Sequence, residues 1–159
     1  KFRQLAATAA RRDLRWHASG GSRPGSWPGG FPSDLRAHFD RHGFGLWALE
    51  LPGTAPFIGF TGLQVTPFRE EWIEVGWRVA RAHWGTGLAP EAARAVVAWS
   101  FARLGLDEIV SMTVPANERS WRVMEKLGLT RDPADDFDHP RLAADSPLRR
   151  HVLYRVKRP

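Results

Sequence analysis

The feature that most constrains this chain is a glycine-containing turn between a strand pattern and a helix pattern. The segment 84–89, WGTGLA, carries Gly85, Gly87 and Ala89 at alternate positions, and an amphipathic run follows it. Glycine adopts backbone conformations that other residues avoid, and it lets a ligand approach the main chain closely. The first amide groups of a helix have no partner within the helix and attract anions. The turn is therefore either a phosphate-binding loop or a structural turn that binds nothing.

The residues before this turn predict strands. Residues 44–51 and 56–65 are apolar runs joined by a Pro-Gly turn, which indicates a hairpin. Residues 71–80 alternate, and one face carries Ile73, Val75, Trp77 and Val79. A helix is expected before them, over residues 35–43, with Ser33 or Asp34 as its cap and Gly43 at its end.

The residues after the turn predict a helix, a strand, a short helix and a last strand. The first helix is expected over 88–104, with Pro90 in its first turn and Gly105 at its end. The second is expected over 116–128, with Asn117 as N-cap and a buried stripe of Trp121, Met124 and Leu127. Strands are expected over 107–115 and 151–158. This order predicts an α/β or α+β domain whose sheet is partly parallel, because helices cross between strands.

The opening of the chain does not follow the same pattern. Residues 1–17 are alanine-rich and compatible with a helix, whereas residues 18–34 are rich in Gly, Pro and Ser, which favours a loop. We therefore expect an atypical segment over 1–34 and one domain over 35–159.

Composition narrows the chemistry. The chain has no cysteine, so thiol catalysis and cysteine-ligated zinc are excluded, and its histidines form no HExxH pattern, so no metal site is expected. The net charge of +6 comes mostly from arginine and suits an anionic cofactor, an acidic substrate, nucleic acid or simply a solvated surface. No run is apolar enough to cross a membrane and no secretory signal is visible, so a cytoplasmic location is expected.

Two familiar phosphate motifs are absent. No GxxxxGK[ST] sequence occurs, and GxGxxG fails because position 90 is proline. The combination of "EVGWRVARAHWGTGLAPEAARA" with "VPANERSWRVMEKLGL" instead resembles the GNAT superfamily of acetyl-CoA-dependent N-acetyltransferases. Within it, the chain looks like the branch that acetylates the N-termini of ribosomal proteins (RimJ/RimL-like). The resemblance implies a mixed, mostly antiparallel sheet flanked by helices and splayed at the cofactor strand, with an atypical or missing first edge strand.

The resemblance also implies where acetyl-CoA binds. The family's [Q/R]-x-x-G-x-[G/A] loop falls on residues 84–89, with a tryptophan in place of Gln or Arg. The preceding strand would offer main-chain groups to the pantetheine arm, and Asn117 would reach the cofactor from the second helix. The expected cofactor-binding residues are Trp77, Arg78, Val79, Trp84, Gly85, Thr86, Gly87, Leu88, Ala89 and Asn117.

Acetyl transfer to an amine needs a base for the amine proton and an acid for the departing thiolate. We expect Glu74 to be the base, although a glutamate on a half-buried strand can equally face solvent. Relatives often have a glutamate on the next strand, at the position of Met112 here. They often use a tyrosine as the acid, at the position of Met124 here. Ser120, three residues after Asn117, matches the acid of the ribosomal branch, and Tyr154 is held in reserve. Each has a structural alternative: a helix-capping serine and a core aromatic.

Other features stay open at this stage. The acidic stretch 135–139, DDFDH, would suit a cationic acceptor or a solvated loop, and most tryptophans are expected in the core or a pocket wall. The leading hypothesis is an N-acetyltransferase acting on a peptide N-terminus or a small amine. The alternatives are a non-catalytic acyl-CoA-binding module and a nucleic-acid-binding protein, the latter lacking a recognisable motif. A homodimer remains open.

Overall fold

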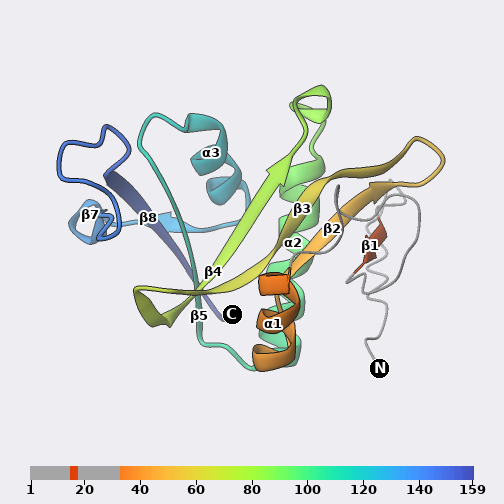
Figure 1. Cartoon of the computed structure of the whole chain (residues 1–159), viewed down its shortest axis with the longest axis horizontal. Coiled ribbons are helices and arrows are strands. Elements are labelled where there is room, and N and C mark those ends of the chain that lie inside the picture. The colour runs from red at the N-terminus through yellow and green to blue at the C-terminus, as the bar shows by residue number, and fades with distance from the viewer. Residues whose placement is uncertain (1–14, 18–32) are drawn as a thin grey trace. The chain divides into compact units, whose positions relative to one another are not determined.

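The computed structural model describes residues 15–17 and 33–159, and Figure 1 shows their elements in chain order. The chain divides into two compact units, one made of residues 1–64 and 76–96 and the other of residues 65–75 and 97–159. Strand β4 (Arg69–Val79) and helix α2 (Leu88–Leu104) each contribute residues to both units.

The first unit contains an antiparallel meander preceded by a helix. Strand β1 (Arg15–His17) pairs with β2 (Leu46–Leu51), and β2 pairs with β3 (Ala55–Thr66) as the predicted hairpin. Helix α1 (Ser33–His42) ends at Gly43, whose positive φ of 74° and N–H bond to the Phe39 carbonyl close the last turn as predicted. Residues 15–17, which the composition of residues 1–17 made compatible with a helix, form a short edge strand instead, and residues 1–14 lie outside the described residues.

Apolar side chains on both faces of the meander make the core of this unit. Leu49 and Leu63 are fully buried, and the ring of Phe39 on α1 meets that of Trp47 on β2 edge to face at 5.6 Å. The first turns of α2 add Leu88, Ala92, Ala93 and Val96, all buried. The start of α2 therefore packs into the core of this unit, and this packing fixes the C-terminal end of the loop that precedes the helix.

The second unit contains the parallel step and the C-terminal strands. Strand β5 (Glu108–Thr113) is parallel to β4 and antiparallel to β8 (Arg150–Lys157), which also pairs with the two-residue strands β6 (Thr130–Arg131) and β7 (Phe137–Asp138). Trp72, Val110 and Leu153 form a buried cluster from three of these strands. Helix α3 (Glu118–Lys126) and the 3₁₀ turn η2 (Pro133–Asp135) complete the unit.

The strand order is β1-β2-β3-β4-β5-β8-β6, which matches the mixed, mostly antiparallel sheet that the sequence predicts. The bounds of α2 agree with the prediction at both ends, and Gly105 follows it with a φ of 65°. The buried stripe predicted on α3 is only partly correct. Of the stripe predicted on α3, only Met124 is buried, whereas Trp121 and Leu127 are half-exposed.

Close approach of main chain to main chain makes Gly62 a requirement of the β2–β3 pair. A Cβ atom there would lie 2.1 Å from the Gly45 carbonyl oxygen and 2.7 Å from the Leu46 Cα. Both are backbone atoms of the partner segment, so no side-chain rotation relieves the clash.

We predict that Gly62→Ala lowers the free energy of unfolding by about 3 kcal/mol, the upper range for overpacking. Gly76→Ala is the matched control, because Gly76 also lies in a strand but has nothing within 4 Å of the place where a Cβ would stand. It should change stability by less than about 1 kcal/mol. Urea unfolding monitored by tryptophan fluorescence measures both, and equal effects of the two substitutions would contradict the packing argument.

Candidate active site

The glycine-containing loop joins the end of β4 to α2 through the 3₁₀ turn η1 (Arg81–His83). Gly85 and Gly87 have φ values of 75° and 85°, which other residues adopt only with strain, so the two glycines are required by the path of the chain. Nothing lies within 4 Å of a Cβ placed on either. Both glycines thus leave open space beside an exposed backbone.

The amide groups of this loop are positioned to bind an anion. Among the described residues, no main-chain oxygen accepts a hydrogen bond from the N–H of Gly85, Gly87, Leu88 or Ala89. Pro90 has no N–H, and the Glu91 N–H is the first to turn inward, donating to the Gly87 carbonyl. The positive end of the α2 dipole coincides with these groups. The loop therefore presents several hydrogen-bond donors and partial positive charge at one place.

The last residues of β4 have main-chain groups that alternate between two edges. The Ala80 N–H donates to the Ile58 carbonyl on β3, and the Gly76 carbonyl accepts from the Thr61 hydroxyl of β3. Since neighbouring residues in a strand point their main-chain groups to opposite sides, those of Trp77 and Val79 point to the edge away from β3. Of the three β4 residues predicted to contact the pantetheine arm, Trp77 and Val79 are therefore the two whose main-chain groups an arm on that edge would meet.

Arg78 differs from its neighbours. Its carbonyl oxygen lies against Gly59 of β3, only 2.0 Å from where a Cβ on that glycine would stand. The main chain of Arg78 thus faces β3, and we remove it from the residues proposed to contact the arm. Its side chain is exposed, and the guanidinium stands 5.8 Å from the centre of the Phe60 ring.

Glu74 lies on β4 where this strand pairs in parallel with β5. Its Cα partner on β5 is Val110, and the carbonyl of the next residue, Val75, accepts a hydrogen bond from the Ser111 hydroxyl. The Met112 N–H donates to the Glu74 carboxylate. Burial raises the pKa of Glu74 to about 7, and the Met112 N–H limits the rise by stabilising the charged form. A carboxyl group with this pKa can accept and release a proton near neutral pH.

Asn117 and Ser120 lie at the start of α3. Asn117 occupies the N-cap position, but its side chain does not cap the helix; its Nδ2 donates instead to the Thr113 hydroxyl at 2.9 Å. The predicted N-cap position is therefore confirmed, although the Asn117 side chain makes no capping hydrogen bond. Ser120 is half-buried in the first turn, and its N–H donates to the Asn117 carbonyl.

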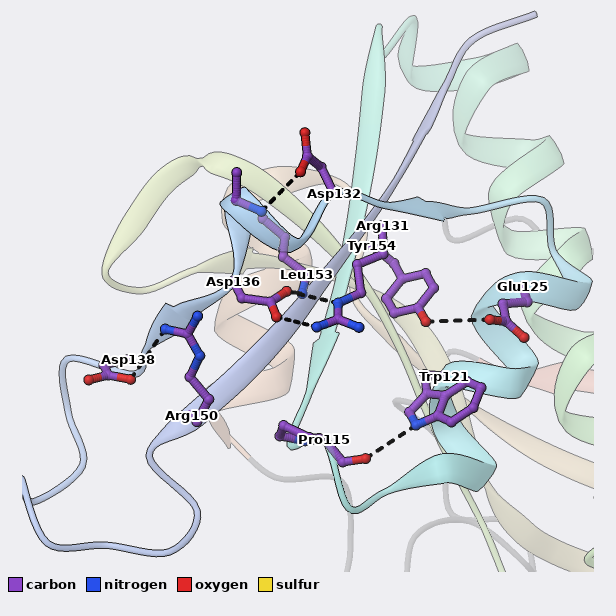
Figure 2. A network of polar contacts seen from close by, with 11 residues as sticks. Pro115, Trp121, Glu125, Arg131, Asp132, Asp136, Asp138, Arg150, Leu153 and Tyr154 are labelled. Atoms are coloured by element: carbon purple, nitrogen blue, oxygen red, sulfur yellow. Dashed lines mark hydrogen bonds and ion pairs between the residues drawn. The ribbon is translucent and has the colours of Figure 1, made fainter.

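Tyr154 takes part in a polar network of β6, β8 and α3, shown in Figure 2. Its ring is buried, with 6% of the residue exposed, and its hydroxyl donates to the Glu125 carboxylate at 3.5 Å. Burial and the nearby Glu125 charge raise the pKa of Tyr154. A tyrosine with a raised pKa is a poorer acid, and this disfavours its use as a proton donor.

The acidic stretch that the sequence offered as a receptor for a cation is engaged internally. Asp135 pairs with Arg155, Asp136 with Arg131, and Asp138 with Arg149 and Arg150. The Arg131 hydrogen bond holds the pKa of Asp136 below its usual range. His139 contacts Phe68 and His151, with ring centres 4.7 Å and 5.0 Å apart. The acidic stretch is therefore held to β8 and its neighbouring segments by ion pairs.

Two contributions to the Glu74 environment have no sequence signal. The Met112 amide is a main-chain group at a position whose side chain cannot titrate, and the Ser111 hydroxyl bonds to a neighbouring strand.

No group of three potential metal ligands occurs in the described part of the chain. No helix there is long and apolar enough to span a bilayer.

Comparison with known proteins shows the family to which the domain belongs. The family model for the acetyltransferase (GNAT) domain matches residues 9–130, so the chain belongs to the GNAT acetyltransferase family, as the motifs predict. The match begins inside the segment 1–34.

Particular relatives agree with this assignment. A protein named FsC-acetyl coenzyme A-N(2)-transacetylase from Aspergillus fumigatus is 38% identical over an alignment of 95 positions that covers 55% of this chain and 40% of that protein. The crystal structure of an acetyltransferase from Agrobacterium tumefaciens is 31% identical with a TM-score of 0.62, covering 77% of this chain and 66% of that one. A ribosomal-protein-S5-alanine acetyltransferase from Vibrio fischeri, 19% identical, shares the fold with a TM-score of 0.63 over 77% and 66% of the two chains. The chain spans about half the length of the curated relatives it matches.

The perturbed carboxyl of Glu74 gives a direct prediction. In ¹³C NMR, its side-chain carboxyl should titrate near pH 7, and the resonance should be missing in Glu74→Gln. Because the folded protein keeps this proton to a pH above the unfolded value of 4.5, the free energy of unfolding should fall as pH rises from about 4.5 to about 7. Glu74→Gln should remove that part of the fall. A midpoint near 4.5 would show that the carboxyl is solvated.

Proposed function

We propose that this protein transfers an acetyl group from acetyl-CoA to a primary amine by direct attack of the amine in a ternary complex. The observation that carries the proposal is a row of amide groups at the start of α2, those of Gly85, Gly87, Leu88 and Ala89, which have no main-chain acceptor within residues 15–17 and 33–159. These groups fit the diphosphate of coenzyme A, since a helix N-terminus with small residues binds phosphate. Family membership supports acetyl-CoA as the donor.

The strand edge supports the second part of this ligand. Coenzyme A joins a diphosphate to an arm that contains two amides, and such an arm can pair with a strand as a neighbouring strand would. We propose that the main-chain groups of Trp77 and Val79 receive the arm and that the loop residues 84–89 hold the diphosphate. Asn117 is kept as a proposed further contact.

Glu74 and Ser120 are proposed to move the protons. The bound thioester supplies an activated acetyl group. Glu74 accepts, through water, the proton that the amine loses as its nitrogen bonds to the carbonyl carbon, and the Ser120 hydroxyl donates a proton to the sulfur as the carbon–sulfur bond breaks. The Trp77 N–H is the proposed donor to the carbonyl oxygen, which gains negative charge during the attack. Ser120 is preferred to Tyr154 because the tyrosine hydroxyl already donates to the Glu125 carboxylate.

The acceptor is proposed to be a peptide N-terminus or a small amine. The name of the Aspergillus relative states transfer to a nitrogen, which supports an amine. The internal pairing of Asp135, Asp136 and Asp138 argues against this stretch as the acceptor's binding site.

The test is release of free thiol from acetyl-CoA in the presence of N-terminal peptides, polyamines and aminoglycosides. With an active acceptor, Glu74→Gln should lower kcat at least 100-fold and abolish the rise of rate through pH 7. Ser120→Ala should lower kcat about tenfold or more without removing that rise. Both should leave acetyl-CoA affinity within about twofold. Acetyl-CoA binding with no turnover on any amine would contradict the transferase proposal.

The phosphate loop can be tested by charge. We predict that Gly87→Glu abolishes acetyl-CoA binding in calorimetry, because a carboxylate at this position repels the diphosphate. Gly87→Gln is the matched control, since it carries the same strain at a φ of 85° without the charge. It should retain measurable binding. Normal binding by Gly87→Glu would show that the bend holds no phosphate.

A further inference from the structure

Trp84 occupies the first position of the loop, where the family pattern has Gln or Arg, and it connects the loop to β4. Its indole Nε1 donates to the Val79 carbonyl at 2.7 Å. Val79 is one of the two residues whose main-chain groups point away from β3. The indole therefore bonds to the strand edge that the proposed arm follows.

Main-chain and side-chain bonds make the connection from Val79 to Gly87 compact. The His83 N–H donates to the Ala80 carbonyl at 2.9 Å, and the Trp84 N–H donates to the Arg81 carbonyl at 3.1 Å. The Thr86 hydroxyl donates to the His83 carbonyl at 2.6 Å. The first two bonds stabilise the turn η1, and the third stabilises the loop. The Trp84–Val79 bond, in contrast, joins the loop to the strand.

The position of the ring is unusual for a tryptophan. The residue is 48% exposed, although Trp47 and Trp72 are 6% and 8% exposed. Burying a tryptophan ring normally stabilises a fold by several kcal/mol, so a half-exposed ring gains only part of this. A shorter donor would not reach the carbonyl without moving the loop. We attribute the presence of a tryptophan at position 84 to the length of its side chain, which allows the indole N–H to bond to the Val79 carbonyl.

We propose that Trp84 is a positioning residue that fixes the distance between the strand edge at Trp77 and Val79 and the diphosphate-binding amides at 85–89. The inference rests on the proposed function. A ligand that touches both places at once needs this distance to match the length of its arm. A ligand that touches only the loop does not. The bond should therefore affect acetyl-CoA and leave a simple diphosphate unaffected.

The experiment compares two ligands on the full chain by isothermal titration calorimetry. ADP contacts the loop only, and acetyl-CoA contacts the loop and the strand edge. Trp84→Phe keeps a ring and loses the donor, and Trp84→Leu loses both. In each variant, the ratio of the ADP dissociation constant to that of acetyl-CoA should fall about five- to tenfold, the effect of one hydrogen bond, with ADP affinity unchanged.

Trp121→Phe is the matched control, because it removes another indole N–H bond to a main-chain carbonyl, that of Pro115 at 3.2 Å. It should leave the ratio unchanged. Equal weakening of both ligands in the Trp84 variants would indicate a collapsed loop and overturn the inference, as would a fall in Trp84→Leu alone, which would assign the effect to the ring. Absence of ADP binding by the unmodified protein would also overturn it. Failure of that protein to bind acetyl-CoA would instead refute the proposed function.

Discussion

The proposed chemistry depends on amide groups at the start of α2 for which the described part of the chain supplies no main-chain acceptor. The fold could have satisfied them with a capping side chain, as helices commonly do. Instead, Gly85 and Gly87 turn the chain through positive φ, Pro90 removes one donor, and Leu88 anchors the helix in the core. Gly85 and Gly87 are exposed, so water can bond to their amide groups at little cost in free energy. They become valuable when an anion replaces that water.

Glu74 shows a different compromise on the same strand. A carboxyl group with a pKa near 7 is less stable in its charged form than it would be in water, and one N–H from Met112 only partly compensates. A fold selected for stability alone would place an apolar or a solvated residue there. Glu74 pairs with Val110 of the parallel strand β5, and its carboxylate accepts a hydrogen bond from the Met112 N–H of that strand. The raised pKa thus follows from burial of the carboxyl group, and the Met112 N–H limits the rise.

The sequence predicts elements whose signals are local. The bounds of α2, the hairpin of β2 and β3 and the glycine ends of the helices follow from periodicity and from the conformations that glycine permits. It does not predict contacts that depend on the direction of one side chain. Asn117 bonds to Thr113 instead of capping α3, and the exposed Trp84 bonds to Val79. Such choices depend on neighbours brought together by the tertiary fold.

The role of the charged residues also depends on their arrangement in the fold and cannot be read from composition. The acidic stretch before β8 suggests a receptor for a cation when only residue types are considered, yet arginines from β6, β8 and the preceding loop satisfy its carboxylates. Arg155 bonds to both Asp135 and Glu108 and also lies over the Trp72 ring at 5.2 Å. Pairs of this kind hold short strands such as β6 and β7 that have few main-chain bonds of their own. Recognition of a cationic acceptor therefore requires carboxylates or main-chain carbonyls elsewhere in the protein.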